Sequence, residues 1–265
     1  MTPSTESAAA STAWSLAGRR AIVTGATKGI GRAAAEELLR LDAAVLAVAR
    51  TAADVDAEVA AWRRAGLERA HGLTADATRD DGIDAILAAA RSRLGGLDVL
   101  VLNVGTNVRK AATEYERGEF QELFRTNVDG AFELARRAHP LLRAGRDPAV
   151  VMVGSVAGDV AVGSGAPYAA TKAALSMLVR ALASEWGPDG IRVNAVAPWY
   201  IDTPLVQPVL QRPGVVDKIR ERTPLGRTGD PAEVARAIAF LALPAASYVS
   251  GQTLAVDGGF LARGW

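Results

Sequence analysis

A tyrosine and a lysine four residues apart have side chains that could carry out proton transfer. Tyr168 and Lys172 occur in the run Pro167-Tyr-Ala-Ala-Thr-Lys172, ahead of an apolar stretch that ends at Gly187-Pro188. On a helix, residues four apart lie on the same side. A nearby ammonium favours the phenolate and lowers a phenol pKa of about 10, typically by about 1–3 units. Tyr168 is therefore a candidate proton donor or acceptor, although such a pair also occurs by chance on protein surfaces.

A serine precedes this pair at the end of a predicted strand. Ser155 follows the apolar run 149–154, which is typical of a buried parallel strand. In open α/β sheets, ligands bind at the carboxyl ends of the strands. Ser155 and Tyr168 therefore become a candidate catalytic pair, provided that a cofactor site lies at the same edge.

A glycine-rich turn near the start of the chain supplies that cofactor site. The apolar run 21–23 leads into Thr24-Gly25-Ala-Thr-Lys-Gly29-Ile-Gly31 and then into an alanine-rich helix. Glycines at a strand-to-helix turn let the backbone approach a pyrophosphate, and the helix N-terminus attracts it. We expect dinucleotide binding here, and a mere tight turn is the alternative.

The end of the second predicted strand indicates which dinucleotide is bound. An NAD site usually places an acidic residue about 20 positions after the glycines, whereas this chain has Ala49-Arg50 and no carboxylate before Asp54. Arg50 and Lys28 together suit a 2′-phosphate. We therefore expect NADPH rather than NADH. Two solvated surface cations are the alternative interpretation.

Composition excludes several other classes of protein. The chain has 265 residues, 49% of them hydrophobic, with a net charge of +1, no cysteine and two histidines. These values argue against nucleic-acid binding, thiolate catalysis and a histidine-built metal site. No apolar run approaches membrane-spanning length, and residues 1–13 read as a disordered leader rather than a secretion signal. We expect a soluble cytoplasmic protein without metal.

Short apolar runs alternate with longer helical patterns from residue 18 onward, which predicts βαβ units and a parallel sheet. We expect a single Rossmann-type domain over 14–265, doubly wound with helices on both faces, and a proline-rich lid over about 199–229. The predicted strands are 20–24, 44–49, 70–74, 99–103, 149–154, 192–197 and 253–256. The predicted helices are 29–41, 52–65, 82–93, 115–144, 167–186 and 231–241.

Taken together, the motifs resemble the short-chain dehydrogenase/reductase family over nearly the whole chain. They are Thr24-Gly25-x3-Gly29-x-Gly31, Asp76, Asn103-Val-Gly105, Asn127, Ser155, Tyr168-x3-Lys172, Asn194, Pro198 and Asp257-Gly-Gly259. The segments 105–110, 198–205 and 240–252 look like the tropinone-reductase-like branch. Helices over about 115–144 and 167–186 form homotetramer interfaces in such proteins, so a homotetramer is expected.

The resemblance implies a role for each matched residue. Tyr168 would be the general acid in carbonyl reduction, Lys172 would lower its pKa and hold the nicotinamide ribose, and Ser155 would hold the substrate oxygen. Asn127 would support a proton-relay water, with a purely structural amide as the alternative. Asp76 would contact the adenine and Thr203 the carboxamide. The full set of implied cofactor contacts is Gly25, Thr27, Lys28, Gly29, Ile30, Gly31, Arg50, Asp76, Ala77, Asn103, Gly105, Tyr168, Lys172, Pro198, Ile201 and Thr203.

Two departures from the family pattern affect the expected site. Leu102 replaces the first asparagine of Asn-Asn-Ala-Gly, and Trp199 replaces the glycine of Pro-Gly, where its indole should narrow the substrate space. A mainly apolar substrate pocket is expected, although core or subunit packing would account equally well for any one of its members. They are Val108, Val160, Trp199, Tyr200, Leu205 and Val206. Arg109 is a candidate contact for an anionic substrate, with a solvated surface arginine as the alternative.

These features predict an NADPH-dependent reductase of a small ketone, for which a tropinone-like amino ketone is one candidate. A 3-oxoacyl-carrier-protein reductase is the nearest rival, and it would need a basic patch such as Arg212, Lys218, Arg220 and Arg222. A non-catalytic NADP(H) sensor is the alternative from another class. An extended epimerase or dehydratase would need a longer region after Trp199.

Overall fold

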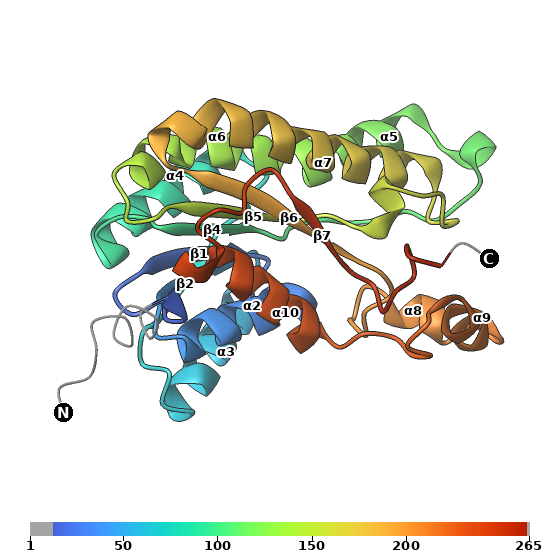
Figure 1. Ribbon diagram of the computed structural model, residues 1–265, viewed down its shortest axis with the longest axis horizontal. Coiled ribbons are helices and arrows are strands. Elements are labelled where there is room, and N and C mark those ends of the chain that lie inside the picture. Colours follow the sequence, from blue (N-terminus) through green and yellow to red (C-terminus); the bar gives the residue numbers. More distant parts are fainter. Residues whose placement is uncertain (1–12, 264–265) are drawn as a thin grey trace.

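A computed structural model describes residues 13–263. A seven-stranded parallel sheet with helices on both faces forms its centre, as the sequence predicts (Figure 1). Residues 1–12 of the predicted leader lie outside the described residues. Within residues 13–263, no helix is both long and apolar enough to cross a membrane.

The strand order is β3-β2-β1-β4-β5-β6-β7, so the chain reverses its winding direction between β1 and β4. Ligands bind at such a switch point in doubly wound sheets. The strands are β1 (Arg20–Thr24), β2 (Ala44–Ala49), β3 (Ala70–Thr74), β4 (Val99–Leu102), β5 (Ala149–Val153), β6 (Arg192–Pro198) and β7 (Thr253–Val256). The α-helices are α2 (Gly29–Arg40), α3 (Ala52–Arg64), α4 (Asp80–Ala89), α5 (Arg117–Phe124), α6 (Gly130–Arg143), α7 (Ala166–Trp186), α8 (Gln207–Leu210), α9 (Val215–Arg222) and α10 (Pro231–Ala242).

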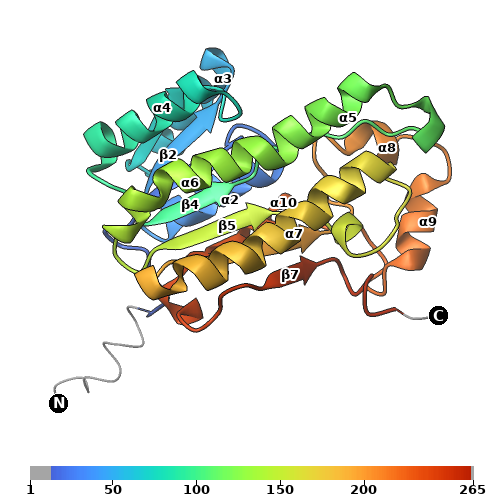
Figure 2. The same cartoon turned by 90° about the horizontal axis from the view of Figure 1, so that it is seen from above.

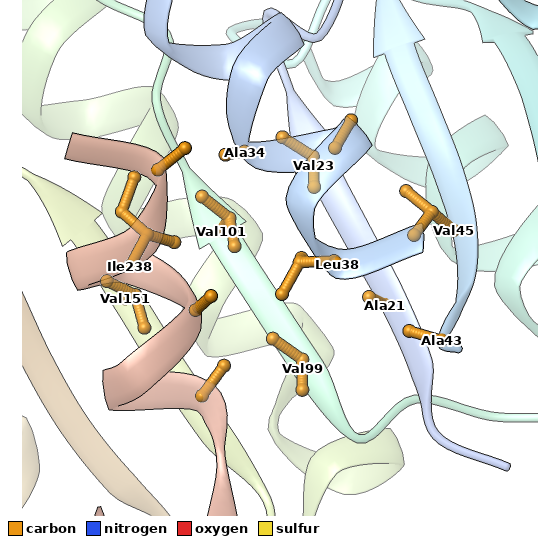
Figure 3. Packing of buried hydrophobic residues seen from close by; sticks show 14 of the residues in the cluster. Ala21, Val23, Ala34, Leu38, Ala43, Val45, Val99, Val101, Val151 and Ile238 are labelled. Atoms are coloured by element: carbon orange, nitrogen blue, oxygen red, sulfur yellow. The ribbon is translucent and has the colours of Figure 1, made fainter. Parts of the chain in front are cut away.

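The central strands bury both of their faces because successive side chains point to opposite sides. Val99 and Val101 of β4 pack in the cluster that contains α2 and α10, where Leu38 and Ile238 lie over the sheet (Figure 3). Leu100 and Leu102, which point to the other face, pack in a second cluster with α4, α6 and α7. This double burial explains why the strands read as continuous apolar runs.

One predicted helix is interrupted in the structure. The expected helix over 115–144 consists of α5, a π-helical turn at Arg125–Asp129, and α6. A π-helical turn adds only one residue to a helical turn, so the apolar spacing on either side still looks helical in the sequence. Such turns occur frequently at functional sites, and this one carries Asn127.

The loops that follow the strands gather at one end of the molecule. The start of α7, the loop before α5, and the short helices α8 and α9 lie at this end (Figure 2). The segment 199–229 is closed at its base by a bridge between Ile201 and Gly229, where Asp202 N–H donates to the Gly229 carbonyl at 2.9 Å. The structure therefore places the predicted lid at the end of the molecule where the predicted catalytic helix begins (Figure 2).

Candidate active site

Helix α7 carries the tyrosine and the lysine. Pro167 lies in its first turn, where a missing N–H costs nothing. The Lys172 side chain is buried, and its Nζ donates to the Val153 carbonyl oxygen at 2.9 Å at the end of β5. The same Nζ lies 5.6 Å from the centre of the Tyr168 ring. The helix therefore brings an ammonium and a phenol together at the carboxyl edge of the sheet.

Burial dominates the protonation of both groups. It lowers the pKa of Lys172 to about 8 and raises the pKa of Tyr168 above its ordinary value. The Ser155 hydroxyl and the positive charge of Arg109 act in the opposite direction on Tyr168. The net shift of the Tyr168 pKa is therefore upward, because desolvation of the phenol outweighs the effects of Ser155 and Arg109, and the lowering of this pKa by Lys172 stays a prediction.

Ser155 follows β5 in extended backbone and begins a short 3₁₀ turn, where its Oγ accepts from the Ala157 N–H at 3.1 Å. A side-chain hydrogen bond between Ser155 and the Tyr168 hydroxyl acts to lower the Tyr168 pKa. A hydroxyl held on rigid backbone beside a phenol can donate to the same oxygen atom of a ligand. The two residues that the sequence pairs 13 positions apart are thus brought together by the turn between β5 and α7.

Asn127 fixes the loop that follows β4. Its Oδ1 accepts from the Thr106 N–H at 2.8 Å, and its Nδ2 donates to the Thr106 carbonyl at 2.9 Å and to Thr171 Oγ1 at 3.0 Å. Both amide N–H groups are therefore engaged by protein atoms. A Cβ built on Gly105 would lie 3.4 Å from both Asn127 Oδ1 and Lys172 Nζ, so this loop passes directly over the catalytic helix.

The glycine-rich turn after β1 has the close packing that a pyrophosphate site requires. Gly25 and Gly29 have φ values of +64° and +53°, which side chains disfavour. A Cβ on Gly31 would clash with the Gly25 carbonyl, and one on Gly29 would lie 3.1 Å from Thr203 Cγ2. Asn103 Nδ2 donates to the carbonyls of Thr24 at 3.0 Å and Gly25 at 3.3 Å. Asn103 thus holds the turn, and the Thr203 side chain packs close to Gly29.

The other residues predicted to contact the cofactor differ in how far they are exposed to solvent. Arg50 is exposed after β2. Burial of the Asp76 carboxyl raises its pKa, but hydrogen bonds from Thr78 and the charge of Arg50 lower it, so the pKa of Asp76 lies below its ordinary value. Lys28 forms an ion pair with Asp54 at 2.8 Å, so a phosphate there would share Lys28 with a carboxylate. Thr27 and Ala77 are buried, Ile30 packs against the core, Pro198 ends β6, and Ile201 is buried at the base of the lid segment.

The residues present fit a dinucleotide. The backbone of the glycine-rich turn and the start of α2 can receive the pyrophosphate. Asp76 follows β3 and would receive the adenosine half, and Thr203 and Lys172 are the residues that would hold the nicotinamide half. Leu102, which replaces an asparagine of the family pattern, is 5% exposed within the core, so it offers this cofactor no polar contact.

Two residues of the predicted substrate pocket, Trp199 and Tyr200, pack close to the C-terminal segment. The Trp199 ring stacks on Phe260 with centroids 3.8 Å apart, and its Nε1 donates to Thr223 Oγ1 at 3.2 Å. Tyr200 meets the edge of Trp199 at 4.5 Å. Val160 and Leu205 are 41% and 49% exposed. Trp199 and Tyr200 also line a cavity of about 240 Å³ that reaches Val256 and Gly258 of the C-terminal segment.

Sequence reasoning missed two features of this site. Phe260 and Thr223 fix the Trp199 indole, yet they lie far from it in the sequence and carried no signal. Asn107 carried no signal in the sequence, whereas Arg109 is a residue that the sequence already offers as a candidate contact for an anionic substrate. Both belong to the loop that Asn127 holds, and both have buried polar atoms without a hydrogen-bond partner among the described residues.

Comparisons with known proteins show the family to which this chain is similar. A family model described as Enoyl-(Acyl carrier protein) reductase matches residues 25–261. A tropinone reductase homologue from Arabidopsis thaliana is 46% identical over 252 residues, which cover 95% of this chain and 96% of the relative. A tropinone reductase homologue from Datura stramonium is 38% identical over 256 residues, covering 95% of each chain.

Solved structures show the same likeness. The crystal structure of a gluconate 5-dehydrogenase from Burkholderia cenocepacia in complex with NADP and tartrate has a TM-score of 0.90 and 32% identity, covering 96% of this chain and 99% of that one. A short-chain type dehydrogenase/reductase from Mycobacterium marinum has a TM-score of 0.88 and 31% identity, covering 94% and 98%.

The fold and the site thus define a nicotinamide-dependent oxidoreductase. The chain belongs to the short-chain dehydrogenase/reductase family, and tropinone reductase homologues are among its similar relatives.

Proposed function

We propose that this protein uses NADPH to reduce a small ketone reversibly to a secondary alcohol. The observation that carries the proposal is the meeting of Tyr168, Ser155 and Lys172 at the sheet edge onto which the glycine-rich turn also opens. The comparisons include both reductases and dehydrogenases, which name the two directions of such a reaction.

The chain's own residues account for the proton that the reaction needs. When bound, the nicotinamide supplies a hydride to the carbonyl carbon. Because burial raises the pKa of Tyr168, its hydroxyl is protonated at neutral pH and can donate to the carbonyl oxygen. Ser155 donates a hydrogen bond to the same oxygen. The Lys172 ammonium, whose Nζ lies 5.6 Å from the centre of the Tyr168 ring, then stabilises the phenolate that remains.

Two further observations support the finer parts of the proposal. The exposed Arg50 suits the 2′-phosphate of NADPH, and a similar solved structure contains NADP. The segment 199–229 is fixed at its base and contains two short helices. We assign it as the lid of a single catalytic domain.

Replacing Tyr168 tests the function directly. We expect Tyr168→Phe to bind NADPH with unchanged affinity and to lose turnover by about 100-fold or more, the usual scale of acid–base catalysis. The measurement is NADPH oxidation across a panel of small ketones, with cofactor binding followed by fluorescence. Tyr248→Phe is the matched control because Tyr248 is fully exposed.

Retained turnover in Tyr168→Phe would assign the proton to another group. NADPH binding by the unaltered protein without turnover of any ketone would favour the sensor. A 3-oxoacyl-carrier-protein reductase has one supporting observation, since Lys218, Arg220 and Arg222 are exposed on α9 near the site. Faster turnover of 3-oxoacyl thioesters than of free ketones would establish that function instead.

A further inference from the structure

The loop between β4 and α5 is held at two points over the catalytic helix. Asn127 clamps Thr106 by two hydrogen bonds at one end. At the other end, the Tyr115 hydroxyl donates to the Val108 carbonyl, and a Cβ on Gly165 would lie 3.1 Å from that carbonyl oxygen. Gly165 directly precedes α7. Residues 107–109 are therefore fixed beside Tyr168 rather than free in solvent.

Arg109 carries an unbalanced charge within this loop. The residue is half-buried, and its Nε is buried with no hydrogen-bond partner among residues 13–263. The adjacent Lys110 bonds to Glu119 at 2.7 Å, whereas no carboxylate of the described chain forms an ion pair with Arg109. A buried guanidinium N–H without a partner is costly, so the site is arranged for a partner that the protein itself does not supply.

Asn107 adds a second group of the same kind. Both its Oδ1 and its Nδ2 are buried and have no partner within the described residues. Two polar side chains of one fixed loop thus have buried atoms without a partner among residues 13–263. The sequence predicts a mainly apolar pocket that includes Val108, whereas its two neighbours Asn107 and Arg109 are polar.

Arg109 and Tyr168 belong to two segments that are in contact. The Val108 carbonyl oxygen, one residue before Arg109, lies 3.1 Å from a Cβ built on Gly165, three residues before Tyr168, and the positive charge of Arg109 acts to lower the Tyr168 pKa against the effect of burial. A planar guanidinium fits a carboxylate with two parallel hydrogen bonds. A ligand that places its carbonyl oxygen on Tyr168 and Ser155 would therefore bring a nearby carboxylate within reach of Arg109.

We infer that the substrate is an oxo acid whose carboxylate pairs with Arg109, with Asn107 as a hydrogen-bonding neighbour, and this inference rests on the ketone reductase activity proposed above. Arg109 would then be the residue that selects negatively charged substrates over neutral and positively charged ones. A protonated amino ketone of the tropinone kind would meet a like charge at the same place and be rejected.

The test compares each acid with its uncharged counterpart. The probes are 2-, 3-, 4- and 5-oxo acids of four to six carbons and their methyl esters, assayed with NADPH. We expect the unaltered protein to prefer one acid over its ester by about 10-fold or more in kcat/KM, the effect of a charge-assisted contact. Arg109→Gln should lose about 10–100-fold on that acid, mainly through KM, and stay within about 3-fold on the ester.

Two further variants make the result specific. Arg109→Lys should restore only part of the preference, because an ammonium lacks the forked geometry. Arg117→Gln removes an exposed arginine from the start of the nearby α5 and should change neither substrate. NADPH affinity should be equal in all of these proteins.

The opposite results are equally clear. Equal turnover of acid and ester by the unaltered protein, or equal loss of both in Arg109→Gln, would overturn the carboxylate contact. Reduction of neutral ketones with no acid accepted would overturn this inference and leave the proposed reductase intact. Absence of all ketone turnover would overturn the proposed function itself, and the inference with it.

Discussion

At the scale of single residues, Lys172 brings an ammonium into a fully buried position. Burial lowers its pKa from 10.5 to about 8, and a single hydrogen bond to the Val153 carbonyl compensates for the water it has lost. A lysine in such a place reduces stability, which is the usual consequence of building an active site. Its retention there is explained by chemistry rather than by folding.

This reasoning predicts that Lys172→Met stabilises the protein at pH 7 while abolishing turnover. A pKa shift from 10.5 to about 8 corresponds to about 3 kcal/mol, and loss of the partner of the Val153 carbonyl costs about 1 kcal/mol. We therefore expect a net gain of roughly 2 kcal/mol in the free energy of unfolding, measured by urea denaturation.

The free energy of unfolding should also depend on pH in a direction that follows from the Lys172 pKa. Because the unfolded chain binds more protons at Lys172 between about pH 8 and 10.5, stability of the unaltered protein rises with pH in that window. Below about pH 8 the full penalty remains, so the advantage of Lys172→Met should shrink as pH rises. Lys218→Met, at an exposed position of α9, should show neither effect. A less stable Lys172→Met at pH 7 would contradict the argument.

At the scale of elements, the ends of neighbouring strands decide which residues meet at the adenosine side. Ala49 of β2 pairs with Thr74 of β3, so Arg50 and Asp76 emerge at the same edge of the sheet. The glycine-rich turn emerges from the adjacent β1. This register, rather than any property of Arg50 alone, makes it a candidate for the cofactor phosphate.

We expect Arg50→Asp to raise the KM for NADPH by about 10–100-fold, the size of a lost charge-assisted contact. The KM for NADH should change by only a few-fold, because NADH has no 2′-phosphate. Steady-state kinetics with both cofactors check this, with Arg64→Asp on the outside of α3 as the control. Equal weakening of both cofactors would remove the phosphate contact from Arg50.

At the scale of the whole molecule, the outer surface of α5 and α7 carries exposed apolar side chains. Phe120 is 46% exposed and stacks on Phe124, and Met177 is 58% exposed. Both helices lie on the same face of the sheet (Figure 2). Exposed apolar surface of this kind marks contact surfaces between proteins, and it coincides with the helices that the family resemblance assigns to a tetramer.

We predict a particle of four 27.6 kDa chains. Met177→Glu and Phe120→Glu should each shift it toward smaller species, because an unpaired carboxylate in an apolar interface is strongly unfavourable. Light scattering after size exclusion measures the mass. Ala88→Glu, on an exposed position of α4, should leave it unchanged. A monomeric unaltered protein would refute the prediction.

The sequence by itself determined the parallel sheet, the order of its elements and the short list of residues with useful chemistry. These properties follow from local patterns: apolar runs, helical spacing, and glycines at a strand-to-helix turn. The predicted ranges of β1, β2 and β3 match the structure because each strand is bounded by local turn residues.

Tertiary structure alone decided the electrostatics and the shape of the substrate space. Whether Lys172 or burial controls the Tyr168 pKa depends on how much water the fold excludes, which no spacing records. The stacking of Trp199 on Phe260 likewise depends on segments that meet only in the folded chain, as does the burial of Arg109 Nε without a partner among residues 13–263. Long-range packing determines these features, because the environment of a side chain is made by residues distant in the sequence.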